Sequence, residues 1–309
     1  MIITVTLNPA LDKTVSIPDF LPGTANHITA VRTDPGGKGL NVSKVIARLG
    51  GASTAVALLG GATGRRIAKE MDVPGITCRF TMTASETRTN LKIVDPARHT
   101  NTDLNEPGPT VSPDTLCSML AEVTAALCPG DIVVLSGSLP QGVPTDTYGV
   151  WTAACRKAGA LVFLDADGEA LAHGVAAKPY LIKPNTHELS QLVGRTLAHI
   201  DDLLAAARGI IASGVARVVV SMGKNGALFI SREQVYRAEG ISVPIGSTVG
   251  AGDSMVAALA YAAACGMDDE NTARLAIAAS AASVECCGSQ AAARSAIDAL
   301  LPRVAFHKI

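Results

Sequence analysis

Short runs of β-branched residues alternate with amphipathic stretches along most of this chain. The runs read IITVTL, TAVALLG, DIVVLSG, ALVFLDA, YLIKPN and ARVVVSMG, and the stretches between them include LNVSKVIARLG, PDTLCSMLAEVTAALC, TDTYGVWTAACRKAG and IDDLLAAARGIIASG. This alternation is typical of βαβ units and predicts an α/β fold around a mostly parallel, doubly wound sheet. Aromatic residues make up only 3% of the chain, so the core has to be built from Val, Leu, Ile and Ala, as in a sheet buried on both faces.

Ligands of such sheets bind beyond the carboxyl ends of the strands. Polar residues follow several of the predicted strands, at 8–12, 136–141, 183–188 and 221–226 and at Asp165 and Asp167. We therefore expect the functional residues to meet at that edge of the sheet.

Two stretches break the alternation. Residues about 13–34 and about 86–104 show period-two patterning with turn residues and no helical pattern. They predict strands of a small separate sheet, which we interpret as a flap over the strand ends because long excursions are often lids. Surface hairpins without function are the alternative. The chain, 1–309, is expected to form a single domain with this lid.

Charge and cysteine content exclude several classes of protein. The net charge is −1, which does not favour nucleic acid or an anionic membrane as a partner. The start MIITVTLNPALD lacks the features of a signal peptide, and no apolar run has spanning character. The seven cysteines form no CxxC pair and the six histidines show no metal spacing, so we expect reduced thiols, no zinc site and a cytoplasmic protein.

The stretch GGKGLNVSKVIARLGG crowds glycines at the start of a helix. Free N–H groups there attract anions, Gly37 lets a ligand approach the main chain, and Lys38 could neutralise a phosphate, with Asn41 close behind. An ordinary tight turn with a solvated lysine is an equal alternative. The order of residues is not that of a P-loop.

The stretch STVGAGDSMVAALAYA predicts a second such helix start. Gly250, Ala251 and Gly252 would present successive N–H donors to an oxyanion, beside Asp253. Asp253 could be a plain N-cap or first-turn carboxylate, but a cap requires no pair of glycines. A carboxylate beside an anion hole can accept a hydroxyl proton while the hole holds the transferring group.

Three further stretches follow strands. In IKPNTHEL, Asn185 and Glu188 could organise a hydrated Mg²⁺ with a polyphosphate, or form a capping box, and the two roles are compatible. In SMGKNGALFI, Gly223 and Gly226 predict a turn between two strands that could line a nucleotide pocket. In SGSLPQG, Ser138 suits a sugar or phosphate contact, although turn chemistry would also explain it.

Two stretches near the expected lid carry further candidates. In LNPALD, Asp12 lies just past the first strand, where it could accept two sugar hydroxyls or act as a turn aspartate. Arg88 and Asn90 lie in the flap; arginine suits a phosphate, yet exposed strand arginines are common.

Together these stretches resemble the signatures of the ribokinase-like (PfkB) sugar kinases. The motifs TLNPALD, TRTNLKI, NEPGP, SGSLPQGVP, DADGEAL, KPNTHEL and SMGKNGAL also match in order over nearly the whole chain. The resemblance is to the branch that phosphorylates ketohexose phosphates with ATP. It implies a three-layer α/β/α Rossmann-like domain with a small β-sheet lid that also forms a homodimer.

The resemblance also implies residue roles. Asp253 would be the catalytic base, with Gly250, Ala251 and Gly252 as its anion hole. The sugar phosphate would face Asp12, Gly37, Lys38, Asn41, Arg88, Asn90 and Ser138. ATP would face Lys183, Asn185, Glu188, Ser221, Gly223, Gly226 and Thr248, with Mg²⁺ held through water by Asn185 and Glu188 and a monovalent cation as a further candidate ligand.

Several functions stay open at this point. Fructose 1-phosphate, fructose 6-phosphate and tagatose 6-phosphate are all candidate acceptors, and the GGKG turn with TNLKI and LNEPGP favours the first. A sugar-phosphate sensor that has lost the chemistry would not need Asp253, the glycines, Asn185 and Glu188 together. A dehydrogenase is disfavoured because no GxGxxG opens the first helix.

Overall fold

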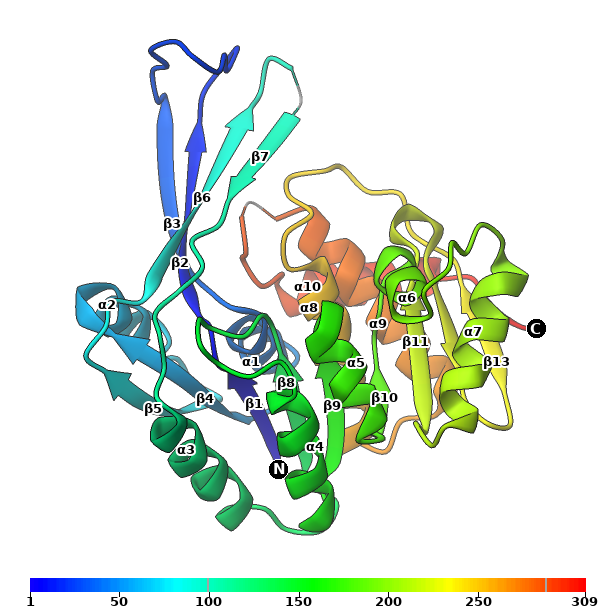
Figure 1. The fold of residues 1–309 in the computed structure, drawn as a ribbon. Coiled ribbons are helices and arrows are strands. Elements are labelled where there is room, and N and C mark those ends of the chain that lie inside the picture. Colours follow the sequence, from blue (N-terminus) through cyan, green and yellow to red (C-terminus); the bar gives the residue numbers. More distant parts are fainter. Residues whose placement is uncertain (99, 287) are drawn as a thin grey trace.

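The computed structural model describes residues 1–98, 100–286 and 288–309, so His99 and Cys287 lie outside the described residues. Figure 1 shows a large sheet flanked by helices and a small sheet projecting from one end. The large sheet has ten strands in the order β14-β13-β12-β11-β10-β9-β8-β1-β4-β5, and the small sheet has four in the order β3-β2-β6-β7. The predicted parallel sheet is confirmed from β11 to β5.

The strands and helices alternate as expected over most of the chain. The large sheet contains β1 (Ile2–Thr6), β4 (Ser53–Gly60), β5 (Ile76–Thr83), β8 (Ile132–Ser136), β9 (Leu161–Asp165), β10 (Leu181–Ile182), β11 (Arg217–Ser221), β12 (Ala227–Ile230), β13 (Val235–Ala238) and β14 (Phe306–Lys308). The helices are α1 (Lys38–Arg48), α2 (Gly61–Glu70), α3 (Pro113–Ala125), α4 (Thr147–Lys157), α5 (Gly168–Ala176), α6 (Thr186–Leu192), α7 (Ile200–Ala212), α8 (Ala251–Ala264), α9 (Asp269–Val284) and α10 (Arg294–Leu300). Two short 3₁₀ turns, Gly223–Asn225 and Leu301–Arg303, complete the set.

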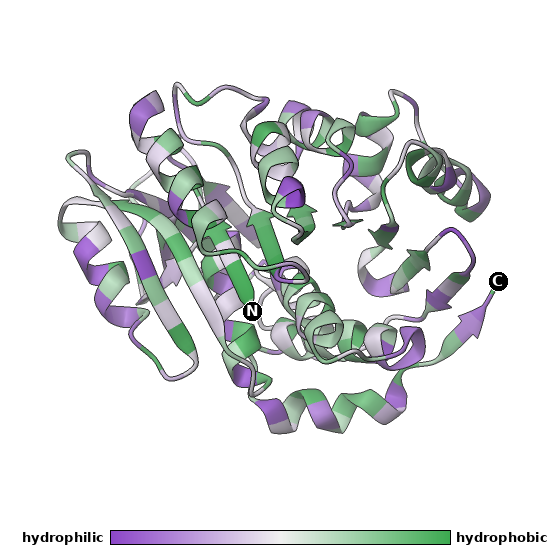
Figure 2. Cartoon of the chain, turned by 90° about the horizontal axis from the view of Figure 1, so that it is seen from below, coloured by the Kyte–Doolittle hydropathy of each residue, from purple (hydrophilic) through white to green (hydrophobic). Residues whose placement is uncertain are grey.

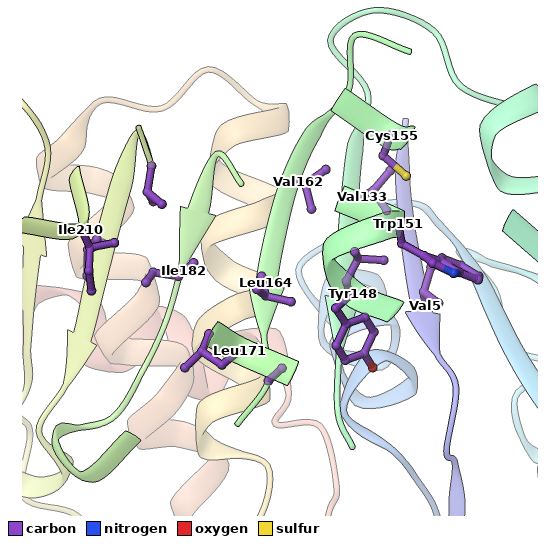
Figure 3. Close-up of a cluster of buried hydrophobic side chains, with 14 of the residues drawn as sticks. Val5, Val133, Tyr148, Trp151, Cys155, Val162, Leu164, Leu171, Ile182 and Ile210 are labelled. Carbon is purple, nitrogen blue, oxygen red and sulfur yellow. The ribbon is translucent and has the colours of Figure 1, made fainter. Parts of the chain in front are cut away.

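Period-two patterning along the strands divides the core between the two faces of the large sheet. In β8, Val133 and Leu135 join one buried cluster while Ile132 and Val134 join the other. The first cluster packs under α3, α4, α5 and α7, and Figure 3 shows Trp151 and Tyr148 of α4 within it. The second packs under α1, α8, α9 and α10. Hydrophobic strands therefore lie between two helical layers, as Figure 2 shows from below, and the expected three-layer α/β/α arrangement is confirmed.

The small sheet is built from β2 (Ala10–Ser16), β3 (Ala30–Gly36), β6 (Arg88–Asp95) and β7 (Thr100–Leu104). These strands fall in the two stretches that break the alternation, but β2 begins before residue 13. Asp12 is therefore not a turn residue, because it pairs in β2 with Asp34 of β3 and Asn90 of β6. This register brings Asp12 and Asn90 side by side on the small sheet.

Three antiparallel strands extend the large sheet, of which the sequence pattern predicted only the one after the turn at Gly223 and Gly226. β12 and β13 form hairpins with their neighbours, and the C-terminal β14 pairs with β13 at the edge. The predicted turn at Gly223 and Gly226 does join two strands, β11 and β12. Across the residues that the structure describes, no helix is long and apolar enough to cross a membrane.

Candidate active site

One cleft of about 1020 Å³ lies at the carboxyl ends of the parallel strands and under the small sheet. All of the site residues expected from the sequence line it: Asp12, Gly37, Lys38, Asn41, Arg88, Asn90, Ser138, Lys183, Asn185, Glu188, Ser221, Gly223, Gly226, Thr248, Gly250, Ala251, Gly252 and Asp253. They come from segments spread over 240 residues, and they meet because parallel strands end at one edge of the sheet. Their individual roles remain predictions that the geometry constrains.

The start of α8 supplies a cradle of backbone donors. Gly250 adopts φ +82°, in the left-handed region where a side chain is disfavoured, and is the residue immediately before the helix. Ala251 and Gly252 form the first helical positions, whose N–H groups have no partner within the helix. The cradle therefore points unpaired donors and the positive end of the helix dipole into the cleft.

Asp253 lies in the first turn of α8 and is 7% exposed. It is not the N-cap, and its carboxylate accepts a hydrogen bond of 2.8 Å from Asn41 Nδ2 of α1. The pKa of Asp253 is raised to about 6, mainly by burial; the Asp165 carboxylate acts in the same direction, while Lys38, Asn41 and Lys183 lower it. A carboxylate with this pKa is ionised at neutral pH yet close enough to neutrality to take a proton, which suits a general base.

Two lysines from opposite sides of the cleft share one buried carboxylate. Asp165, at the end of β9, is 2% exposed, and its Oδ1 lies 3.4 Å from Lys38 Nζ and 3.3 Å from Lys183 Nζ. Burial alone would raise the pKa of Asp165, but the two ammonium groups hold it below its ordinary value. In turn the Asp165 carboxylate raises the pKa of Lys38, which stays charged. A Cβ on Gly252 would lie 3.4 Å from Lys183 Nζ, so this ammonium borders the donor cradle.

The small sheet and the loop after β1 form the opposite wall. Arg88 donates to the carbonyl oxygen of Asn8 at 2.9 Å and contacts Ser138 Oγ at 3.4 Å, and Asn8 Nδ2 reaches the same hydroxyl at 3.2 Å. Asn90 Nδ2 donates to Asp12 Oδ1 at 3.1 Å. Burial raises the pKa of Asp12. Among the described residues, the buried atoms Asn8 Oδ1 and Asn90 Oδ1 have no protein partner, which leaves acceptors for ligand hydroxyls.

Asn185 and Glu188 form the capping box that the sequence allowed. Asn185 Oδ1 accepts from the Glu188 backbone N–H at 2.8 Å, and Glu188 Oε2 accepts from the Asn185 backbone N–H at 2.8 Å. The box fixes both side chains at the cleft wall without using all of their lone pairs. Within the described residues no cluster of three or more His, Cys, Asp or Glu could hold a metal ion. This donor set fits a largely hydrated Mg²⁺ that arrives with phosphates rather than one caged by the protein.

The remaining wall consists of hairpin and loop residues. Gly226 adopts φ +87°, and a Cβ there would overlap the carbonyl oxygen of Ala238, so only glycine permits this turn. Ser221, Gly223, Lys224 and the 240–249 segment line the same side, with Ile245 strongly exposed. This shallow, partly apolar side suits a flat ring better than a charged group.

Sequence reasoning missed several lining residues. Lys92 and Asp103 of the small sheet, Asn105 and Ser289 also line the cleft. Lys44 is half-buried, donates to the carbonyl oxygens of Pro35 and Ser289 and has a pKa lowered by desolvation. In the sequence Lys44 is an ordinary lysine of an amphipathic helix. Lys92 and Asp103 could have been predicted as lining residues, since they are polar residues of the segment that the sequence analysis assigned to the flap.

The fold and the cleft define a class of protein. Ribokinase from Arabidopsis thaliana, solved with ribose and ATP, superposes with a TM-score of 0.76 at 24% identity over 97% of this chain and 98% of that one, which shows a ribokinase-like fold. The model of the pfkB family of carbohydrate kinases matches residues 5–296. The chain belongs to this family, and the resemblance seen in the sequence is confirmed.

Two bacterial proteins are much more similar. The 1-phosphofructokinase of Rhodobacter capsulatus is 43% identical over 278 residues, which cover 90% of this chain and 88% of that protein. Phosphofructokinase-2 from Escherichia coli, in complex with substrates and products, superposes with a TM-score of 0.93 at 34% identity, with 98% of each chain covered. The same enzyme has been solved with potassium, with fructose-6-phosphate and in a tetrameric inhibited form, at TM-scores of 0.92, 0.90 and 0.91.

Proposed function

We propose that this pfkB carbohydrate kinase transfers the γ-phosphoryl group of ATP to fructose 1-phosphate and forms fructose 1,6-bisphosphate. The observation that carries the proposal is the buried Asp253 carboxylate beside the N–H cradle of 250–252, in a cleft that also holds Lys38 and Arg88. The 43% identity to a 1-phosphofructokinase supports this acceptor over others.

The chemistry follows from the positions of the charges. Asp253 takes the proton of the acceptor's free primary hydroxyl as that oxygen attacks the γ-phosphorus; the new O–P bond forms as the bond from phosphorus to the ADP oxygen breaks. The N–H groups of 250–252 and the Lys183 ammonium stabilise the equatorial oxygens of the transferring group. Base catalysis of this kind contributes about 10²–10⁴-fold.

The acceptor binds on the other side of Asp253. Lys38, Arg88 and Ser138 hold its existing phosphate, and the fork of Arg88 suits two phosphate oxygens. The Asp12 carboxylate accepts hydrogen bonds from the sugar hydroxyls, and the Asn90 side-chain amide can both accept from them and donate to them. Lys38 and Lys183 share Asp165, so these three groups together present one net positive charge to the bound phosphates.

ATP with Mg²⁺ is the donor. Asn185 and Glu188 hold the hydrated ion, which neutralises polyphosphate charge, while Ser221, Gly223, Gly226 and Thr248 line the nucleotide. A monovalent cation is a further ligand, because the Escherichia coli relative was solved with potassium. Val31 and Leu104 of the small sheet and Leu21 and Ile28 of the segment between β2 and β3 expose apolar surface, which supports a homodimer formed through the lid.

A coupled assay of ADP release tests the acceptor. We expect kcat/KM for fructose 1-phosphate to exceed that for fructose 6-phosphate and tagatose 6-phosphate by at least about tenfold, which corresponds to about 1.4 kcal/mol in the transition state. Preference for fructose 6-phosphate is the second candidate, since the relative solved with that sugar has a TM-score of 0.90. Binding of all three without turnover would instead identify a sugar-phosphate sensor.

Lys38 should matter for the acceptor more than for the donor. We expect Lys38→Ala to raise KM for fructose 1-phosphate about tenfold or more while KM for ATP changes by less than about threefold, because one charge-assisted phosphate contact is lost. Steady-state kinetics with each substrate varied in turn measures the split. The reverse pattern would assign Lys38 to the nucleotide.

The pKa of Asp253 predicts the acid side of the pH profile. Only the carboxylate can take the proton, so kcat/KM should rise from pH 5 to pH 7 with a midpoint near the value of about 6. The phosphate of the acceptor also titrates near pH 6. The pKa of the acceptor phosphate is therefore measured separately by ³¹P NMR. The pKa of the Asp253 carboxyl group is measured by ¹³C NMR of the ligand-free protein labelled at aspartate, and the spectrum is compared with that of Asp253→Asn. An aspartate signal at this pKa that persists in the variant would contradict the assignment.

A further inference from the structure

A second cavity, of about 260 Å³, lies at the opposite edge of the large sheet from the cleft. Its walls are the amino ends of β9, β10 and β11, the adjoining ends of β12 and β13, and the last turns of α8 with the segment leading into α9. Among the described residues, none that lines this cavity also lines the kinase cleft. The same helix α8 carries Asp253 in its first turn and contributes Leu259 and Ala263 to this cavity, so one rigid element connects the two sites.

The cavity gathers aromatic residues in a chain that has few of them. The sequence contains five Phe, four Tyr and one Trp. Phe163, Tyr180, Phe229 and Tyr236 all line the cavity, so four of these ten aromatic residues meet at one place. Phe163 and Tyr180 stack with ring centroids 5.7 Å apart, and Phe306 stacks on Tyr236 at 4.7 Å. Stacked rings fixed in this way offer flat faces to a planar molecule.

Arg217 supplies an oriented polar group in the same wall. Its Nε donates to Tyr180 Oη at 3.2 Å, and its Nη1 lies 2.5 Å from Asp269 Oδ1 of α9. The guanidinium has five N–H donors, so these two bonds fix its plane and leave further donors for an acceptor. Since Arg217 and Asp269 neutralise one another, the lining carries no net charge, and an uncharged ligand fits better than an anion.

Gln234 adds an unsatisfied acceptor. It lines the cavity, and its Oε1 is buried without a hydrogen-bond partner among the described residues. Burial of an amide oxygen without a donor is unfavourable, so a ligand N–H that reached this oxygen would bind favourably.

From these contacts we infer that the cavity between the strand amino ends and the C-terminal end of α8 is a second binding site, for a small uncharged heteroaromatic ring bearing an N–H donor. The ring stacks against Tyr180 and Tyr236, accepts a hydrogen bond from Arg217 and donates one to Gln234. Nothing in this inference depends on the proposed kinase reaction. The volume of this cavity, about 260 Å³, is too small for a whole nucleotide, because drug-sized ligands occupy pockets of about 300–1,000 Å³.

Adenine and benzimidazole, each with an N–H donor and a ring-nitrogen acceptor, serve as probes, with cyclohexanol as a non-planar control, in saturation-transfer NMR and calorimetry. Mg-ADP is present at saturation so that a ring bound in the kinase cleft is displaced. Ala263→Leu places a larger side chain in the cavity wall, and Ala264→Leu is its matched control, since the neighbouring Ala264 is exposed and does not line the cavity. Met267→Arg, at the exposed mouth, is a second blocking variant.

We expect at least one of the two rings to bind the native protein and Ala264→Leu, and to bind Ala263→Leu and Met267→Arg at least about tenfold more weakly. Thermal melts establish that all variants fold. The inference is overturned if neither ring binds up to its solubility limit, if cyclohexanol binds equally well, or if the blocking variants bind like the native protein.

Discussion

Asp253→Asn is expected to lose about 10²–10⁴-fold in kcat, because it removes the only function that the carboxylate alone performs, the acceptance of the hydroxyl proton. The amide keeps the shape of the side chain and can still accept from Asn41 Nδ2, so the cleft is expected to stay intact. The Kd for Mg-ATP, measured by calorimetry, should change by less than about threefold. A variant with near-native kcat would remove Asp253 from the reaction.

The same substitution is expected to stabilise the fold. Burial raises the pKa of Asp253 from 3.8 to about 6, so the folded protein loses stability as the pH rises through this interval and the carboxylate ionises. At pH 7.5 the neutral amide avoids this cost, which is on the order of 3 kcal/mol, and Tm should rise by a few degrees. Asp114→Asn is the matched control: this exposed first-turn aspartate of α3 lies far from the cleft, and its loss should lower Tm slightly and leave kcat unchanged.

The sequence predicted the central architecture because local patterns and packing agree there. The β-branched runs became β1, β4, β8, β9, β10 and β11, and the amphipathic stretches became α1, α3, α4 and α7. The helix start at 250–253 could be recognised because an N-cap alone does not require two glycines beside the carboxylate. The strands of a parallel sheet end at the same edge, so predicting that sheet also predicts that the site residues after its strands meet in one cleft.

Other features depend on contacts that no local pattern records. Asn41 and Asp253 are separated by 212 residues, and the sharing of Asp165 by Lys38 and Lys183 joins three segments. The edge strand β14 is three residues long and forms only because β13 offers an unpaired edge. Lys44 donates to the carbonyl oxygen of Ser289, a contact that the pattern of its own helix could not indicate.

Gly252→Ala is expected to reduce kcat by on the order of 10²-fold without harming the fold. Gly252 has helical geometry, so alanine is tolerated by the backbone, and its Cβ would lie 3.4 Å from Lys183 Nζ, an ordinary contact. The added methyl group would, however, occupy the cradle that we propose holds the transferring phosphoryl group. A displacement of about 1 Å from the reactive geometry costs about 10² in rate.

Gly209→Ala is the matched control for Gly252→Ala. It shows what a Gly→Ala substitution in a helix does when it lies far from the cleft. Gly209 lies on the exposed side of α7, and a Cβ there meets nothing within 4 Å. Both alanines favour the helix, by up to about 0.5–1 kcal/mol at an interior position, so urea unfolding should show equal or greater stability for each variant. Only Gly252→Ala should lose turnover, with KM for fructose 1-phosphate changing less than kcat, because the cradle acts on the transferring group. Equal activity in the two variants would mean that the phosphoryl group is held elsewhere in the cleft.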